Sequence, residues 1–131
     1  MRIVAIVARI LLGLVFLVFG LNGFLHFIPN PPPPPAAGAF FGALAATRYM
    51  FVLIFGTQVI GGALLLVGMM VPFALVILAP VIVNIIAFHI FLVPAGLPLA
   101  IVVTALELYL AWRNRSAFAP LFDGAPRQPA T

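Results

Sequence analysis

Polar side chains interrupt the long apolar runs of this chain at six positions, and these residues could carry chemistry. They are Asn22, His26, Gln58, Asn84, His89 and Glu107. Amide and imidazole groups can hydrogen-bond a ligand, and a carboxyl group can also exchange a proton. An unpaired polar group is costly in hydrocarbon, so such residues usually face an interior or a water-filled cavity. We therefore expect any function to depend on these side chains.

The composition indicates an integral membrane protein. Of the 131 residues, 66% are hydrophobic and only 6% are charged, and the mean hydropathy is +1.34. The net charge of +4 does not indicate a nucleic-acid partner, because the arginines lie singly between apolar runs and form no basic patch. The chain contains no cysteine, which excludes disulfides, thiolate metal sites and cysteine nucleophiles.

The apolar runs predict an all-α, polytopic membrane protein with a four-transmembrane-helix bundle. The predicted spans cover about residues 3–28, 49–70, 73–92 and 97–112. The proline run 31–35 favours an extended spacer, and the apolar segment 36–47 is too short to span, so we expect an interfacial helix there. Residues 1–115 would form the transmembrane domain, and residues 116–131 a polar, poorly ordered cytoplasmic tail.

The distribution of arginine predicts the orientation of this bundle. Five of the six arginines lie close to the start of the first span or after the last span: Arg2, Arg9, Arg113, Arg115 and Arg127. The loops after the first and third spans carry only Arg48. Because positive residues concentrate in cytoplasmic segments, both termini are predicted to be cytoplasmic.

This topology places five polar residues in the outer half of the bilayer, as a candidate pocket for a polar head group. They are Asn22, His26, Gln58, Asn84 and His89. Asn22 and His26 are four residues apart and share a helix face. Asn84 and His89 are about 140° apart around an ideal helix, so they do not face one pocket unless the helix is distorted near Pro80. The alternative is that these side chains only hydrogen-bond between helices.

We predict no metal site among these residues. Neutral imidazole is a ligand for metals and haem, but two histidines without a carboxylate at the same depth make an incomplete metal site. Arg9 and Glu107 share the inner half instead, and we predict a structural ion pair between the first and last spans. The alternative for Glu107 is a part in proton transfer.

Three segments carry a resemblance to DoxX-like membrane proteins. They are Ala8 to Phe24 (ARILLGLVFLVFGLNGF), Gln58 to Gly62 (QVIGG) and Asn84 to His89 (NIIAFH). The resemblance implies a compact four-helix bundle, in a bacterial cytoplasmic membrane. Members of the wider family are linked to quinone-coupled oxidation, as subunits of thiosulfate:quinone oxidoreductase or of membrane complexes that handle oxidative stress.

The resemblance favours one hypothesis, a quinone-interacting or accessory subunit of a membrane redox system, and leaves two others open. The five polar residues would hold a quinone, and a membrane redox partner would be needed because the chain shows no electron carrier of its own. One alternative is a structural or chaperone-like subunit without catalysis. The other is a small transporter, which would need a homo-oligomer because one four-helix unit is small and lacks inverted repeats. Whether the chain is an enzyme stays open.

Overall fold

The computed structural model describes residues 2–124, and helices are the only regular secondary structure in that range, which confirms the predicted all-α class. Six α-helices and two short 3₁₀ segments follow one another along the described chain: α1 (Arg2–Leu25), α2 (Pro35–Ala46), α3 (Met50–Val67), α4 (Val71–Phe91), η1 (Pro94–Gly96), α5 (Leu97–Arg113), α6 (Arg115–Phe118) and η2 (Ala119–Phe122).

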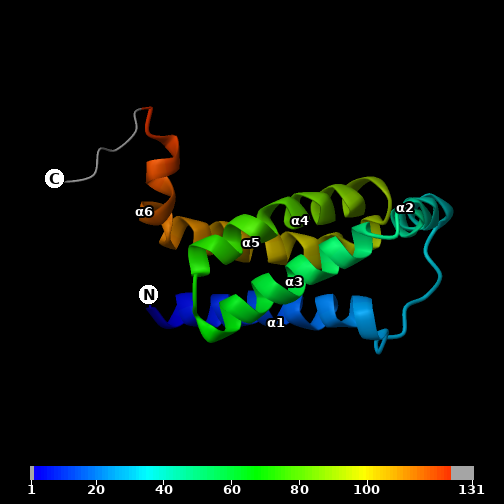
Figure 1. The fold of residues 1–131 in the computed structure, drawn as a ribbon, viewed down its shortest axis with the longest axis horizontal. Helices are drawn as coiled ribbons and strands as arrows, with labels where there is room; N and C mark the ends of the chain where they lie inside the picture. Colours follow the sequence, from blue (N-terminus) through cyan, green and yellow to red (C-terminus); the bar gives the residue numbers. More distant parts are fainter. Residues whose placement is uncertain (1, 125–131) are drawn as a thin grey trace.

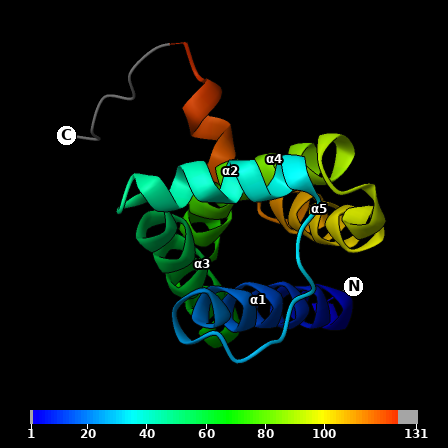
Figure 2. The same ribbon diagram turned by 90° about the vertical axis from the view of Figure 1, so that its right-hand side faces the viewer.

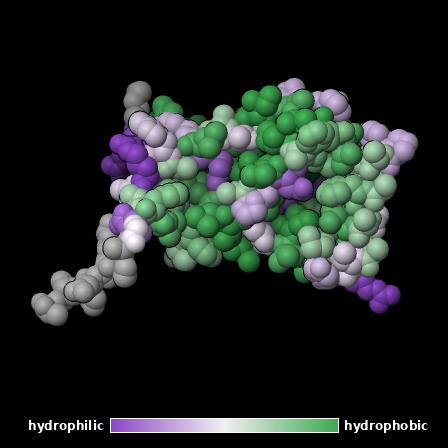
Figure 3. All heavy atoms as spheres, turned by 90° about the horizontal axis from the view of Figure 1, so that it is seen from above, coloured by the Kyte–Doolittle hydropathy of each residue, from purple (hydrophilic) through white to green (hydrophobic). Residues whose placement is uncertain are grey.

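Four of these helices are long and apolar enough to cross a membrane: α1, α3, α4 and η1 together with α5. The shortest has 18 residues, which corresponds to about 27 Å of helix, close to the thickness of a bilayer's hydrocarbon core. Hydrophobic surface covers most of the length of the bundle, and hydrophilic residues gather mainly toward its two ends (Figure 3). The chain is therefore an integral membrane protein whose environment is a lipid bilayer.

The ends of the spans agree with the sequence prediction to within a few residues, and local chemistry explains the differences. α1 ends at Leu25, earlier than predicted, because His26 adopts a left-handed conformation with φ of 52°. The side-chain oxygen of Asn22 then accepts a hydrogen bond of 2.8 Å from the backbone N–H of Ile28. α3 ends at Val67, and the next residue, Gly68, caps it with a φ of 76° and an N–H that donates to the Leu64 carbonyl.

The four spans form a bundle in which α1 and α3 pack most closely (Figure 1). Glycines make this approach possible. A Cβ atom on Gly62 would lie 2.5 Å from the Leu17 nitrogen, and one on Gly20 would lie 2.9 Å from the Val59 nitrogen. Backbone therefore meets backbone along this interface, an arrangement that small residues allow in membranes.

The short helix after the first span lies across one end of the bundle, over α3 and α4 (Figure 2). Its aromatic residues hold it there. The Phe41 ring lies 5.1 Å from the ring of Phe88 in α4 and 6.4 Å from that of Phe51 in α3, measured between centroids. We call this the α2 end, and we call the opposite end, where α1 begins and α5 ends, the base.

Side chains fill the base half of the bundle. The main cluster of buried apolar residues comes from all four spans and lies mostly between the base and the middle: Ala8, Leu12, Phe16, Leu65, Ala74, Leu75, Leu78, Ile82, Val103 and Leu110. Phe118 of α6 also packs against this cluster. Residues 115–122 are thus helical rather than irregular, contrary to the predicted tail, because an aromatic side chain fixes them to the bundle. Residues 125–131 of that tail lie outside the described residues.

The predicted ion pair between Arg9 and Glu107 is not formed. The Arg9 guanidinium donates instead to the carbonyl oxygens of Leu65, at 2.6 Å, and Leu66, at 3.3 Å. These carbonyls belong to the last turn of α3, which has no helical donors left for them and carries a partial negative charge. Glu107 is 7% exposed, and its Oε2 atom has no hydrogen-bond partner in the described chain.

Candidate functional site

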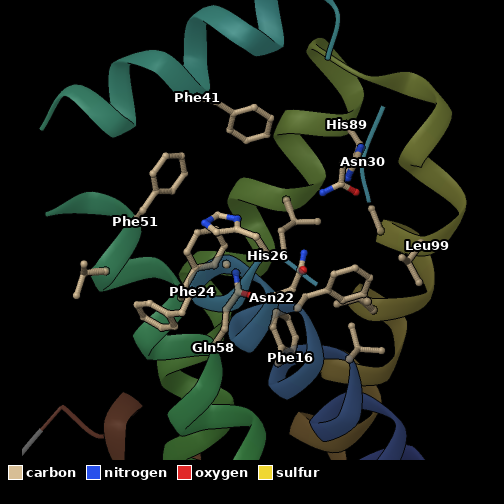
Figure 4. Close-up of a pocket in the computed structure, with 18 residues that line it drawn as sticks. Phe16, Asn22, Phe24, His26, Asn30, Phe41, Phe51, Gln58, His89 and Leu99 are labelled. Carbon is tan, nitrogen blue, oxygen red and sulfur yellow. The ribbon is translucent and has the colours of Figure 1, made fainter. Parts of the chain in front are cut away.

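A cavity of about 770 Å³ occupies the α2 end of the bundle, in the space between the four spans (Figure 4). Phe41 of α2 lines it from above, and Phe16 and Val103 border it on the side of the buried core. The other lining residues come from the spans and from the segment after α1: Val15, Phe19, Asn22, Gly23, Phe24, His26, Asn30, Phe51, Val52, Phe55, Gln58, Ile85, His89, Leu99 and Ala100.

The lining combines aromatic rings with a few neutral polar groups. Six of the lining residues are phenylalanine, five are asparagine, glutamine or histidine, and none is aspartate, glutamate, lysine or arginine. The volume lies within the range of pockets for small organic ligands, about 300–1,000 Å³, which are also mostly apolar with few polar groups. This chemistry suits a flat, largely apolar molecule with uncharged oxygen atoms.

Gln58 is the most buried polar residue of the cavity. It lies in the middle of α3, is only 7% exposed, and its amide makes no hydrogen bond to any described residue. In Figure 4 its side chain projects into the same space as those of Asn22 and His26. An amide that faces a mostly apolar cavity has few hydrogen-bond partners, and a ligand with a suitable oxygen atom could supply one.

Asn22 and His26 reach the cavity through the way α1 ends. The Asn22 Oδ1 atom already accepts the Ile28 N–H, so its Nδ2 group is the part of the amide left to donate to a ligand. The left-handed backbone of His26 turns the chain out of the helix. Its imidazole lines the cavity and makes no hydrogen bond within the described chain. Both residues therefore offer hydrogen-bonding groups to a ligand.

His89 enters the cavity from α4 in a fixed orientation. Its Nδ1 atom lies 3.0 Å from the Val93 carbonyl oxygen, which can only accept, so Nδ1 carries the proton. In the neutral ring, Nε2 is then an acceptor. Gly96 packs directly against the ring, where any Cβ atom would overlap it, and the Phe88 ring contacts it edge-on at 5.1 Å. His89 thus offers an acceptor, whereas Asn22 offers donors.

The structure separates Asn84 from the other four predicted site residues. Asn22, His26, Gln58 and His89 line the cavity, but Asn84 lies on the exposed face of α4 and lines a small separate groove. The angular separation of Asn84 and His89 along α4 explains this difference, because the helix continues through Pro80 to Phe91.

Asn30 is a cavity residue that the sequence reasoning missed. It lies between α1 and the proline run, and it is exposed at the cavity. Its position beside Pro29, in the segment that must cross from α1 to α2, was the only available signal. No group of three or more histidine, cysteine, aspartate or glutamate residues that could hold a metal ion occurs within residues 2–124.

Comparisons with known proteins identify no relative of this chain. No protein-family model, curated protein or solved structure matches the chain. The similarity to DoxX-like proteins therefore stays a prediction from the three sequence segments.

Proposed function

We propose that this protein binds a quinone in the cavity at the α2 end and serves as a quinone-interacting or accessory subunit of a membrane redox system. The main supporting observation is that Gln58, a residue only 7% exposed, presents an amide without a hydrogen-bond partner to an aromatic cavity of about 770 Å³. The resemblance to DoxX-like proteins supports the same assignment. Electrons would come from or pass to a partner protein.

The hydrogen-bonding groups of the cavity match the two forms of such a ligand. A quinone carries two carbonyl oxygens, which need donors, and the amide groups of Gln58 and Asn22 can supply them. A quinol carries hydroxyl groups, which also need an acceptor, and the Nε2 atom of His89 can supply it. The phenylalanine rings provide flat apolar surface for the head group.

A lipid-soluble ligand also fits the position of the cavity. Val52 and Leu99 line it and are 60% and 50% exposed, on surfaces that face lipid in a bilayer. A ligand with a long apolar tail could therefore keep the tail in the lipid while its head group occupies the cavity.

We further propose that the protein lies in a bacterial cytoplasmic membrane with both termini in the cytoplasm. Arg2, Arg113 and Arg115 lie at the base, whereas Arg48 follows α2 at the other end. The positive-inside rule then places the base on the cytoplasmic side and the cavity in the outer half of the bilayer.

The test is direct quinone binding to the purified full-length protein in lipid nanodiscs. Gln58→Leu removes the buried amide, and we expect quinone binding to weaken about 5- to 30-fold, the effect of one lost hydrogen bond of about 1–2 kcal/mol. Thr57→Val is the matched control, because the Thr57 hydroxyl donates to Leu53 within the same helix and does not line the cavity. Thr57→Val should bind quinone like the unchanged protein.

The same assay separates quinone from ordinary lipid as the occupant. A fatty acid of similar size lacks the ring carbonyls, and we expect it to bind weakly and to respond little to Gln58→Leu. Equal binding of both ligands, or no effect of Gln58→Leu on quinone binding, would contradict the proposal. That outcome would favour the structural-subunit hypothesis, in which the polar groups serve the bundle alone.

A further inference from the structure

Asn84 is an uncharged polar side chain on the lipid-facing surface of α4. It is exposed, and its amide has no hydrogen-bond partner in the described chain. Its neighbours on this surface are apolar, and Val83 beside it is 69% exposed. A polar side chain that faces lipid without a partner is unfavourable, so its position calls for an explanation.

Asn84 lies too deep in the membrane for its amide to be hydrated by water at the surface. α4 runs from Val71 to Phe91, so Asn84 lies three residues from its midpoint, or about 4.5 Å along the axis. The hydrocarbon core extends about 15 Å on either side of its centre. With the midpoint of α4 at the centre of the bilayer, the head groups are about 10 Å from Asn84, beyond the reach of an asparagine side chain.

Pro80 lies on the same face of α4, one turn before Asn84. Proline has no N–H, so it cannot donate the helical hydrogen bond to the carbonyl of Val76. Ala87 and Phe91 continue this face beyond Asn84, by the helical spacing of three and four residues. Together these residues form a stripe, Val76, Pro80, Asn84, Ala87 and Phe91, which we call the Asn84 stripe.

The stripe carries both a hollow and a protruding side chain. A groove of about 230 Å³ lies beside Asn84, lined by Phe40, Ala87, Phe88, Phe91 and Leu92. Phe91, at this groove, is 78% exposed. A surface with a hollow and a projection side by side can pack against a copy of itself, as the two halves of a twofold interface must.

We propose that the Asn84 stripe is the contact between two copies of this chain, with the two Asn84 amides hydrogen-bonded to each other. Two copies inserted in the same direction are related by a twofold axis along the membrane normal, so equivalent residues lie at the same depth. Asn84 then meets Asn84 of the second copy. An amide has a donor and an acceptor, so the pair satisfies both, and the small side chain of Ala87 lets the helices approach.

The natural absence of cysteine makes this interface simple to test. Ala87→Cys places one thiol on the stripe of the full-length protein, and Leu108→Cys is the matched control, exposed to lipid on α5. In dilute proteoliposomes, with a short bifunctional thiol reagent, we expect covalent dimers from Ala87→Cys and few or none from Leu108→Cys. Single-molecule photobleaching of the cysteine-free protein should show two copies per particle.

The amide contact is tested by adding Asn84→Leu to the Ala87→Cys protein. We expect dimerisation to weaken about 3- to 30-fold, as for the loss of interhelical hydrogen bonds in a membrane, while Asn84→Gln retains part of it. Quinone binding should be unchanged, because Asn84 does not line the cavity. Equal cross-linking at both cysteines, cross-linking that Asn84→Leu leaves unaffected, or a single copy per particle would each overturn the proposal.

Discussion

The base half of the bundle is filled with side chains, whereas the half near α2 encloses a cavity. Leu12, Leu65 and Leu78 at the base have no exposed surface. At the α2 end, Phe51, Phe55 and other rings surround open space together with unpaired amide and imidazole groups. The same four helices therefore pack in two different ways along their length.

This difference divides stability from ligand binding. Close packing at the base and glycine contacts between α1 and α3 hold the spans together. The α2 end can then keep its cavity and its unpaired Gln58 at a cost that the rest of the bundle offsets. If the comparison is correct, substitutions at the base change stability most, and substitutions at the cavity change ligand binding most.

The largest expected effect is on stability, from truncation of the base core. Leu78→Ala should lower the free energy of unfolding by about 2–5 kcal/mol, because it leaves a void among side chains that cannot fully collapse. Ile85→Ala, on the same helix but at the cavity, should cause a smaller loss because fewer atoms surround that side chain. Unfolding in mixed micelles with increasing denaturing detergent measures both. Equal losses from the two variants would contradict the difference in packing between the base and the α2 end.

A smaller effect is expected where α1 meets α3. Gly62→Ala should lower the free energy of unfolding by about 1–3 kcal/mol, because the new Cβ would lie 2.5 Å from the Leu17 nitrogen. Gly56→Ala is the control on the same helix, where a Cβ meets no atom within 4 Å. The same unfolding assay should show Gly56→Ala as neutral or slightly stabilising. Similar losses from both changes would show that glycine spacing does not set this interface.

Glu107 differs from the apolar residues that fill the base, because it places a polar side chain among them. Because its Oε2 atom is buried without a partner, Glu107→Met should raise the free energy of unfolding by about 1–3 kcal/mol. Glu107→Gln keeps the shape and a polar group, so it should change stability less. Destabilisation by Glu107→Met would contradict the interpretation of Glu107 as an unsatisfied buried group.

The smallest expected effect concerns the turn after α1. Asn22→Ala removes the acceptor for the Ile28 N–H and should lower the free energy of unfolding by about 0.5–1.5 kcal/mol. Asn30→Ala, at the same cavity but without a hydrogen bond in the described chain, should leave stability unchanged. Chemical unfolding of the two variants side by side measures the difference. A larger loss for Asn30→Ala would contradict the role of Asn22 in ending α1.

The sequence predicted the spans well because their lengths and apolar composition depend on the bilayer and not on partner helices. It also predicted the short helix after the proline run. The end of α1 was misplaced because a left-handed histidine is uncommon, and nothing in the apolar run marks Leu25 as the last residue of the helix.

The polar residues could be placed by depth from the sequence, but not by direction or partner. Asn22, His26, Gln58 and His89 share the cavity, whereas Asn84 faces lipid, and this depends on how each helix is rotated about its axis. The depth of Arg9 and Glu107 suggested an ion pair. Arg9 instead meets the last carbonyls of α3, because α1 packs more closely on α3 than on α5.

The sequence alone therefore determined the membrane class, the four spans, the short helix and the inventory of polar groups, since each follows from local composition along one helix at a time. The tertiary structure alone decided which of those groups meet. Helix rotation and glycine-controlled spacing brought four of them into one cavity and left Asn84 outside it. The same packing directed Arg9 to the end of α3 and left Glu107 buried without a partner.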